Sequence, residues 1–256
     1  MPLILTPLPN FPLVKPGDDI SRFIETCMNK AGISVLEGDI FVIAQKVISK
    51  AENRLVYLKE VKPGRKARKL AAVCDKDPRL VELILGESQS VLRNVPGTII
   101  VEHKLGFICA NAGIDHSNVS GSYGDPKDWV LLLPENPDGS AKSIQQELQG
   151  KYMVKLGILI IDSHGRAWRN GITGATIGLA GVPAIVDMRG KVDLFKYCLK
   201  VTQIAAADEL AAGASLMMGQ ACEGTPIVHV RGFPYPLMDD SGLKDLIRDK
   251  KRDLFR

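Results

Sequence analysis

Apolar residues recur every three to four positions in several parts of the chain, which predicts amphipathic helices. The clearest of these helices runs from Ile20 to Ala31, with an aspartate before it as a cap and Gly32 after it as a stop. Similar spacing predicts further helices at residues 66–92, with a second start at 77–78, and at 138–149 and 201–218. Leu243, Leu246, Ile247 and Leu254 predict an apolar stripe on a last helix in the tail.

Short apolar or β-branched runs lie between these helices and predict strands. They occupy residues 40–44, 55–58, 98–102, 107–110, 130–133, 157–161 and 226–230. Strands and helices follow one another without a regular βαβ rhythm, so we expect an α+β fold with mixed sheets and packed helices. We expect residues 1–256 to form a single unit, with room for two subdomains.

Charge and cysteine content narrow the class of protein. The formal net charge is +4 and the isoelectric point about 8.7. Most of the excess lies in the tail from Lys244 to Arg256, so we expect no nucleic-acid partner. The five cysteines are scattered without a C-x-x-C pair, the N-terminus has no basic leader, and the apolar runs are too short to cross a membrane. We therefore expect a cytoplasmic protein without a membrane partner.

Common catalytic motifs are missing from the sequence. There is no G-x-x-x-x-G-K-[ST] loop, and no G-x-G-x-x-G opens a helix after a strand. The four histidines lack zinc-protease spacing, and no G-x-S-x-G elbow is present. A P-loop, a Rossmann fold and the serine-hydrolase pattern are therefore not indicated.

Two aspartates follow predicted strands and are candidates for binding a cation. Asp162 and Ser163 come directly after the apolar run 157–161, and Asp115 follows the run 107–110. Carboxylate and hydroxyl oxygens suit a hard cation that carries nucleotide phosphates. A capping role for Asp162 and an Asx-turn for Asp115 explain these residues equally well.

Three more segments add polar chemistry. Lys50 follows the strand at 40–44 and could neutralise phosphate charge, although a surface lysine is the more common case. The small residues of 218–225 would let backbone N–H groups approach phosphate oxygens, or simply connect a helix to a strand. In the segment 165–171, two arginines flank Trp168 and could grip an anionic substrate or form a surface cation–π cluster. Together these segments indicate metal-assisted phosphoryl transfer without identifying the acceptor.

The same segments, in this order, resemble the coenzyme F-420 gamma-glutamyl ligase family. The likeness runs from Leu8 to Gly232. The segments that carry it are 11–14 with 17–19, Val-Ile-Ser-Lys-Ala-Glu at 47–52, Asn-Ala-Gly-Ile-Asp at 111–115 with 117–118, 132–134 with 137–141, 162–166, 207–209 and 218–219.

The resemblance implies an activity and an assembly. Members join L-glutamate to the lactyl carboxylate of a deazaflavin phosphodiester, consume GTP and form an acyl phosphate, and then add further gamma-linked glutamates. Two divalent ions, Mn²⁺ or Mg²⁺, take part, and the α+β fold forms an intertwined homodimer. Some relatives carry a second, flavin-binding domain, which we do not expect in this chain.

Site residues follow from the resemblance position by position. Asp115 and Asp162 are the expected catalytic pair and hold the first metal, while Ser163 and Gln220 help to hold the second. The residues expected to line the GTP site are Phe11, Pro12, Leu13, Val14, Gln45, Lys46, Lys50, Asn118, Met218, Gly219, Gln220, Ala221, Cys222, Glu223, Gly224 and Thr225.

The chain departs from the family pattern at a few of these positions. Ser163 stands where many relatives have threonine, Gln45-Lys46 replaces a Ser-Thr pair, and Gln220 occupies a position where glutamate also occurs. Two other functions compete with the ligase. The same loops would serve a nucleotide-binding regulator without catalysis, and the isoelectric point suggests a nucleic-acid binder.

Overall fold

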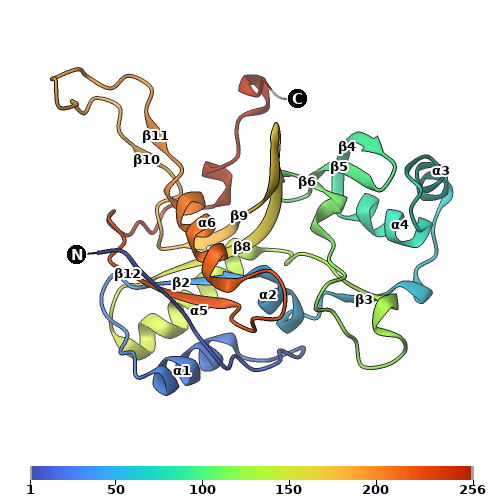
Figure 1. The fold of residues 1–256 in the computed structure, drawn as a ribbon, viewed down its shortest axis with the longest axis horizontal. Coiled ribbons are helices and arrows are strands. Elements are labelled where there is room, and N and C mark those ends of the chain that lie inside the picture. The colour runs from blue at the N-terminus through green and yellow to red at the C-terminus, as the bar shows by residue number, and fades with distance from the viewer. Residues whose placement is uncertain (1, 255–256) are drawn as a thin grey trace.

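A five-stranded mixed sheet forms the centre of the protein in a computed structural model that describes residues 2–254. Its strand order is β1-β12-β2-β8-β9 (Figure 1). The strands are β1 (Ile4–Pro7), β2 (Ile40–Ala44), β8 (Gly157–Arg166), β9 (Arg169–Ala180) and β12 (Ile227–Arg231). Strands β2 and β8 run parallel, and the other neighbours in this sheet run antiparallel.

Helices cover both faces of this sheet because side chains of its central strands alternate between two cores. Phe41 and Ile43 of β2 pack in one core, which also holds residues of α1 (Ile20–Ala31) and α5 (Pro137–Tyr152). Ile40 and Val42 pack in the other core, against α6 (Ala206–Met218). Each fully buried aliphatic side chain contributes about 1.5–3 kcal/mol to folding, so β2 is stabilised from both sides.

A smaller lobe lies beside the central sheet (Figure 1). It combines a three-stranded sheet with two helices around a separate core that includes Val81, Ile84, Ile99 and Val101. Its elements are α3 (Arg65–Cys74), α4 (Pro78–Gly86), β4 (Ser88–Val95), β5 (Thr98–His103) and β6 (Ile108–Ala110).

Short elements connect these parts. Helix α2 (Gln45–Ala51) follows β2 directly, and the pair β3 (Leu55–Tyr57) and β7 (Trp129–Leu131) lies beside α2, with β3 below the smaller lobe in Figure 1. The 3-10 helices are η1 (Leu58–Glu60), η2 (Asn111–Gly113), η3 (Pro126–Asp128), η4 (Leu243–Asp245) and η5 (Lys250–Arg252). An arm projects from the body through the pair β10 (Val186–Asp187) and β11 (Gln203–Ile204) (Figure 1).

Most predicted elements of the central sheet are confirmed, and the fold is α+β with mixed sheets. Helix α1 occupies the predicted residues; the Asp19 side chain accepts a hydrogen bond from the Arg22 N–H, and Gly32 ends the helix with a φ of 66°. Strands β1 and β9 were not predicted. Strand β9 is rich in glycine and passes close under α5 and α6, so its pattern does not look like that of a strand.

Two helix predictions were too long. The segment 66–92 is two helices followed by strand β4, because α3 ends at Asp75 in a left-handed conformation and Pro78 starts α4. The helix predicted from Val201 begins at Ala206, because residues 203–204 pair with β10 instead.

The predicted tail helix is wrong for the described residues. The tail forms only η4 and η5, because Asp245 and Asp249 accept hydrogen bonds from nearby backbone N–H groups and hold local turns. Leu243 is buried, whereas Leu254 is 89% exposed, so the apolar stripe does not form as predicted. Residues 255–256 lie outside the described part of the chain. Within residues 2–254, no helix is long and apolar enough to cross a membrane.

A buried ionic clamp joins β2 to β12 at the start of β2. The Asp39 carboxylate is 1% exposed, and it accepts hydrogen bonds from Arg231 Nε and Nη2 at 2.9 and 2.7 Å. His229 Nε2 lies 2.9 Å from the same carboxylate, and the Leu36 N–H donates to it. Burial alone would raise the pKa of Asp39, but the hydrogen bonds from Arg231 and His229 outweigh it and lower the pKa to about 2.

We predict that Asp39→Asn destabilises the protein by about 2 kcal/mol at pH 7, because it leaves the partly buried Arg231 guanidinium without its counter-charge. The folded pKa of Asp39 lies below its unfolded value of 3.8, so the stability it contributes is present above about pH 4 and falls as pH drops towards 2. Urea unfolding at pH 7 and near pH 2 measures the free energy of unfolding of the wild type and the variant. Asp240→Asn on the exposed surface is the control and should change stability by less than about 0.5 kcal/mol. Equal stability of Asp39→Asn and wild type at pH 7 would contradict the clamp.

Candidate active site

The parallel pairing of β2 and β8 brings distant polar residues to one edge of the sheet. Ala44 at the end of β2 pairs with Ile161 of β8. The next residues are Gln45, which starts α2, and Asp162. Carboxyl ends of parallel strands meet at one edge, and ligands gather at such edges in α/β sheets. The prediction that β8 ends before Asp162 is wrong, because the strand continues to Arg166 in a hairpin with β9.

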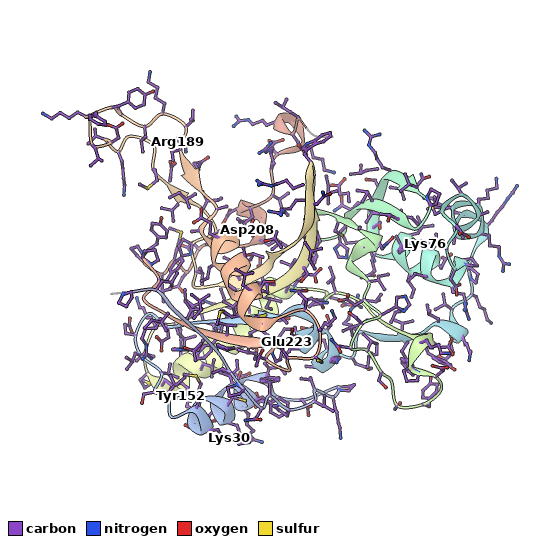
Figure 2. The ribbon with its side chains drawn as sticks, viewed as in Figure 1. Lys30, Lys76, Tyr152, Arg189, Asp208 and Glu223 are labelled. Atoms are coloured by element: carbon purple, nitrogen blue, oxygen red, sulfur yellow. The ribbon has the colours of Figure 1, made fainter. Side chains whose placement is uncertain are left out.

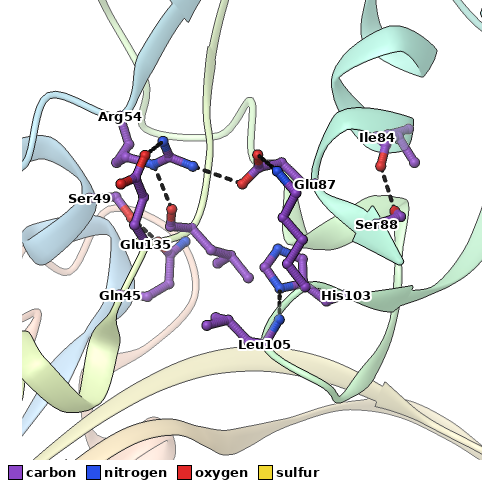
Figure 3. A network of polar contacts seen from close by, with 11 residues as sticks. Gln45, Ser49, Arg54, Ile84, Glu87, Ser88, His103, Leu105 and Glu135 are labelled. Atoms are coloured by element: carbon purple, nitrogen blue, oxygen red, sulfur yellow. Dashed lines mark hydrogen bonds and ion pairs between the residues drawn. The ribbon is translucent and has the colours of Figure 1, made fainter. Parts of the chain in front are cut away.

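Asp115 reaches the same edge from the smaller lobe. It follows η2, and its backbone exchanges two hydrogen bonds with Leu131 at 3.0 and 2.9 Å, which fixes its position. Its carboxylate accepts a 2.6 Å hydrogen bond from Gln45 Nε2 and lies 3.0 Å from Lys46 Nζ. Ser49 Oγ donates to Gln45 Oε1 and so orients the amide towards Asp115 (the Ser49–Gln45 pair is drawn in Figure 3).

Asp162 and Asp115 lie close enough to interact electrostatically. Burial is the main cause that raises the pKa of Asp115; the Lys46 ammonium lowers it, and the negative charge of Asp162 raises it further. Asp162 has its own partner, since His164 Nε2 lies 3.0 Å from its Oδ2 atom. The two distant aspartates therefore lie in the same part of the molecule, and their sharing of one cation stays a prediction.

Aromatic and imidazole rings pack next to Asp162, on the side of its partner His164. The Phe107 ring stacks on His103 and contacts His164, with centroids 5.2 Å apart in both cases. Burial, and then the charge of Asp162, raises the pKa of Cys109 to about 12, so this thiol stays protonated. Sequence reasoning missed His164 and Phe107. Alternation along β8 places His164 on the same face as Asp162, and this signal was available.

Ser163 faces the other side of β8, towards α6. It pairs with Gly174, where an added Cβ would lie 2.6 Å from the Cβ of Ser215 in α6, so only glycine allows this close approach. Ser163 Oγ donates to Gln220 Oε1 at 3.0 Å, and Gln220 Nε2 donates to Ser215. Ser163 and Gln220 are therefore in contact, as a shared ligand role requires.

Lys50 and Asn118 connect the loop after η2 to the loop before β12. Lys50 Nζ donates to the Asn118 carbonyl at 2.8 Å, and Asn118 Nδ2 donates to the Ala221 carbonyl at 2.9 Å. Burial, and then the nearby Lys46, lowers the pKa of Lys50. A half-buried lysine beside a second lysine is well placed for an anionic group.

The loop 219–225 joins α6 to β12 and bends on itself. Gly219 has a φ of 72°, Ala221 N–H donates to Glu223, and Thr225 Oγ1 donates to the Met218 carbonyl. The Glu223 side chain folds back against Gly219 within this loop, which Figure 2 labels. Cys222 is exposed and free.

The segment 11–14 lies between two backbone anchors, one at β12 and one at α2. Leu8 N–H donates to Ile227 at the start of β12, and Gly17 N–H donates to Ala51 at the end of α2. The segment therefore spans the gap between the two elements that carry the other predicted nucleotide residues. Leu13 is 89% exposed there.

Arg54 is a further residue that sequence reasoning missed. Its side chain is 15% exposed and donates to Glu87 at 2.7 Å, Glu135 at 2.6 Å and the Leu133 carbonyl at 2.9 Å (Figure 3). Glu87 belongs to the smaller lobe and Leu133 to the segment that leads into α5, so Arg54 ties the two lobes together beside the aspartates.

The segment containing Glu52 and the one containing Ser140 meet away from the aspartates. Ser140 Oγ hydrogen-bonds to Glu52 in a groove of about 660 Å³ between α1, α2 and α5. Ile48 and Ala51 of α2 and the following Glu52 line the groove, whereas Gln45 and Lys46 contact Asp115. These motif residues hold helices together at this groove.

The two carboxylates of Asp115 and Asp162 could bind a divalent ion only if further oxygen ligands, from water or phosphate, completed its coordination shell. Within residues 2–254, no group of three or more His, Cys, Asp or Glu side chains could hold a metal ion. Asp115 and Asp162 supply two carboxylates, and the Lys46 ammonium lies against the first of them. Mg²⁺ commonly takes one or two carboxylates and completes its shell with water and substrate phosphates, so the pair suits such an ion.

Comparison with known proteins identifies the family. The family model described as F420-0:gamma-glutamyl ligase matches residues 10–232. The chain is 44% identical to the coenzyme F420:L-glutamate ligase of Methanothermobacter thermautotrophicus over the whole of both chains. It is 42% identical to the Methanopyrus kandleri enzyme of the same name, over 99% of this chain and 98% of the relative. The Methanocaldococcus jannaschii enzyme of that name is 39% identical, over 96% of this chain and 94% of the relative.

Taken with an α+β fold that brings Gln45 and Lys46 against Asp115 beside the end of β2, these matches show that the chain belongs to the F420-0:gamma-glutamyl ligase family of amide-bond-forming enzymes.

Proposed function

We propose that this enzyme uses GTP to join L-glutamate to the lactyl carboxylate of a deazaflavin phosphodiester in coenzyme F-420 biosynthesis, and then adds gamma-linked glutamates. The observation that supports the proposal is that Asp115 and Asp162 lie close enough to interact, beside Lys46 and Lys50. The loop after η2 and the loop 219–225 lie next to these lysines. Carboxylates that hold a cation next to ammonium groups are the arrangement that phosphoryl transfer requires.

The nucleotide occupies the space bordered by the segment 11–14, the start of α2 and the loop 219–225. Lys46 and Lys50 supply positive charge for its phosphates. Both lie on α2, near the edge of the sheet that carries Asp115 and Asp162, here called the aspartate edge. Asn118 links Lys50 to Ala221, so binding at one loop is coupled to the other through a single chain of hydrogen bonds.

Two divalent ions, Mn²⁺ or Mg²⁺, accompany the nucleotide and neutralise charge on its phosphates. Asp115 and Asp162 would hold the first ion, and Ser163 and Gln220 would help to hold the second. Gln45 and His164 orient the two carboxylates through their contacts with Asp115 and Asp162.

The reaction proceeds in two steps. A lactyl carboxylate oxygen attacks the γ-phosphorus of GTP, the bond to GDP breaks, and an acyl phosphate forms. The amine of glutamate then attacks the acyl carbon, phosphate leaves, and the amine loses a proton to give the amide. Lys46 and Lys50 stabilise negative charge that develops on the transferred group.

The projecting arm supports the proposal that the enzyme is an intertwined homodimer. Val192, Leu194, Phe195 and Val201 are 65–97% exposed, which is unusual for apolar side chains grouped in one segment. Arg189 marks the arm in Figure 2, well away from the body. A second copy of the chain would cover these side chains.

We expect purified enzyme to add glutamyl mass to the deazaflavin precursor when GTP, Mn²⁺ and L-glutamate are all present. Mass spectrometry of the product and phosphate release measure the reaction, with a known relative run in parallel. Phosphate release should require both acceptor and glutamate. GTP binding without any glutamyl transfer would favour the nucleotide-binding regulator instead.

Asp162→Asn should lower kcat by at least about 100-fold, because it removes a ligand that contributes several kcal/mol to binding the charged transition state. It should also abolish the rise in melting temperature that Mn²⁺ gives the wild-type enzyme. Asp240→Asn, an equivalent change on the exposed surface, should leave both unchanged. A variant at Asp162 with wild-type turnover and Mn²⁺ stabilisation would refute the assigned role.

Leu194→Asp combined with Phe195→Asp should convert the dimer to a monomer, since two charges in an apolar interface leave unpaired groups desolvated. Analytical ultracentrifugation of wild type and variant measures this. Lys191→Asp on the same arm tests for a pure charge effect and should leave the dimer intact. A wild-type protein that sediments as a monomer would rule out the dimer.

A further inference from the structure

The tip of the β8–β9 hairpin carries two arginines and a tryptophan that have no ion-pair or ring partner among residues 2–254. Arg166 ends β8, Arg169 begins β9, and the two are paired directly across the hairpin. Trp168 lies between them in the turn. The hairpin rises from the central sheet as a long ribbon (Figure 1).

The two arginines face one another without an acidic partner. Like charges directly opposite in an antiparallel pair destabilise it. Among the described residues no ion pair involves Arg166 or Arg169, and the one polar contact of Arg166 is a 3.5 Å approach of Nη2 to the Asn170 carbonyl. An anion bound between the two guanidinium groups would remove this repulsion.

Trp168 is presented to solvent in an unfavourable backbone conformation. Its side chain is 88% exposed, and its φ of 64° is a genuine outlier for a bulky residue. The alternative interpretation of this segment, a cation–π cluster, is not found among the described residues, where the cation–π contact joins Lys59 to Tyr57. The indole face is therefore open to a planar ligand.

The tip lies on the same strand as the aspartate edge. Asp162 and His164 alternate onto one face of β8, and Arg166 ends the same strand two residues later, after a shift in the pairing register between Gly165 and Arg166; Arg169 pairs with Arg166. At a rise of about 3.3 Å per residue, four residues separate Asp162 from Arg166 by about 13 Å. A ligand with a carboxylate at one end and an aromatic ring at the other can span this length.

We propose that the hairpin tip is the subsite for the distal part of the acceptor, with Arg166 and Arg169 binding its phosphodiester and Trp168 stacking on its aromatic ring. This inference rests on the proposed function, in which the acceptor carboxylate reacts beside Asp162. Arginine forks match the oxygens of a phosphate, and an exposed indole offers a stacking surface for a planar heterocycle.

The test compares Arg166→Ala/Arg169→Ala, Trp168→Ala and Trp168→Phe with wild type. Steady-state kinetics give KM for the precursor, for GTP and for glutamate, and calorimetry gives Kd for the precursor without GTP. Removing both arginines should raise KM and Kd for the precursor about 10- to 100-fold. Trp168→Ala should weaken it about 5- to 100-fold, and Trp168→Phe should restore most of the loss.

The control is Arg65→Ala, which removes an equally exposed arginine from α3 in the smaller lobe. It should leave every constant unchanged. KM for GTP should not move in any tip variant, because the tip lies away from the nucleotide loops. A rise in KM for GTP parallel to that for the precursor would show a structural effect and overturn the assignment.

The two proposals fail in different ways. If wild-type enzyme adds no glutamate, the proposed function fails, and calorimetry with the precursor alone still decides the subsite. If wild-type enzyme is active but the arginine and tryptophan variants keep wild-type KM and Kd for the precursor, the subsite is wrong while the ligase stands.

Discussion

The structure depends on holding two negative charges together at one edge of a sheet. Asp115 and Asp162 come from separate lobes and repel one another, and Asp162 helps to raise the pKa of Asp115. The Lys46 ammonium and the Gln45 amide offset this repulsion at Asp115, while His164 contacts Asp162. Such a pair is stable only because surrounding groups position it, and a bound cation would relieve the remaining repulsion.

The fold supplies that positioning from both ends of β2. At its end, β2 runs parallel to β8 and delivers Gln45 next to Asp162. At its start, the Asp39–Arg231 clamp joins it to β12, which enters the sheet directly after the loop 219–225. Arg54 then fixes the smaller lobe, and with it Asp115, against the main body. Rigid strands therefore carry the aspartate edge, and exposed loops surround it.

Local sequence patterns predicted many of the helices and strands, but they could not predict which distant segments pair with one another. The helix at 20–31 and the strand at 40–44 have clear periods and clear stops, so both were predictable. Strand β9 was not, because the close approach of α5 and α6 requires glycines that hide the strand pattern. The family resemblance named Asp115 and Asp162 together, but no local signal places Leu131 beside Asp115 or Gln45 between the two lobes.

The most direct test of the shared cation is a double-mutant cycle on Mn²⁺ affinity, measured by electron paramagnetic resonance of free and bound Mn²⁺. Wild type, Asp115→Asn, Asp162→Asn and the double variant are titrated under the same conditions. If the two carboxylates bind one ion, either single change removes most of the affinity and the second adds little, so the effects are strongly non-additive. Additive losses, or a single variant that binds Mn²⁺ as tightly as wild type, would contradict the account.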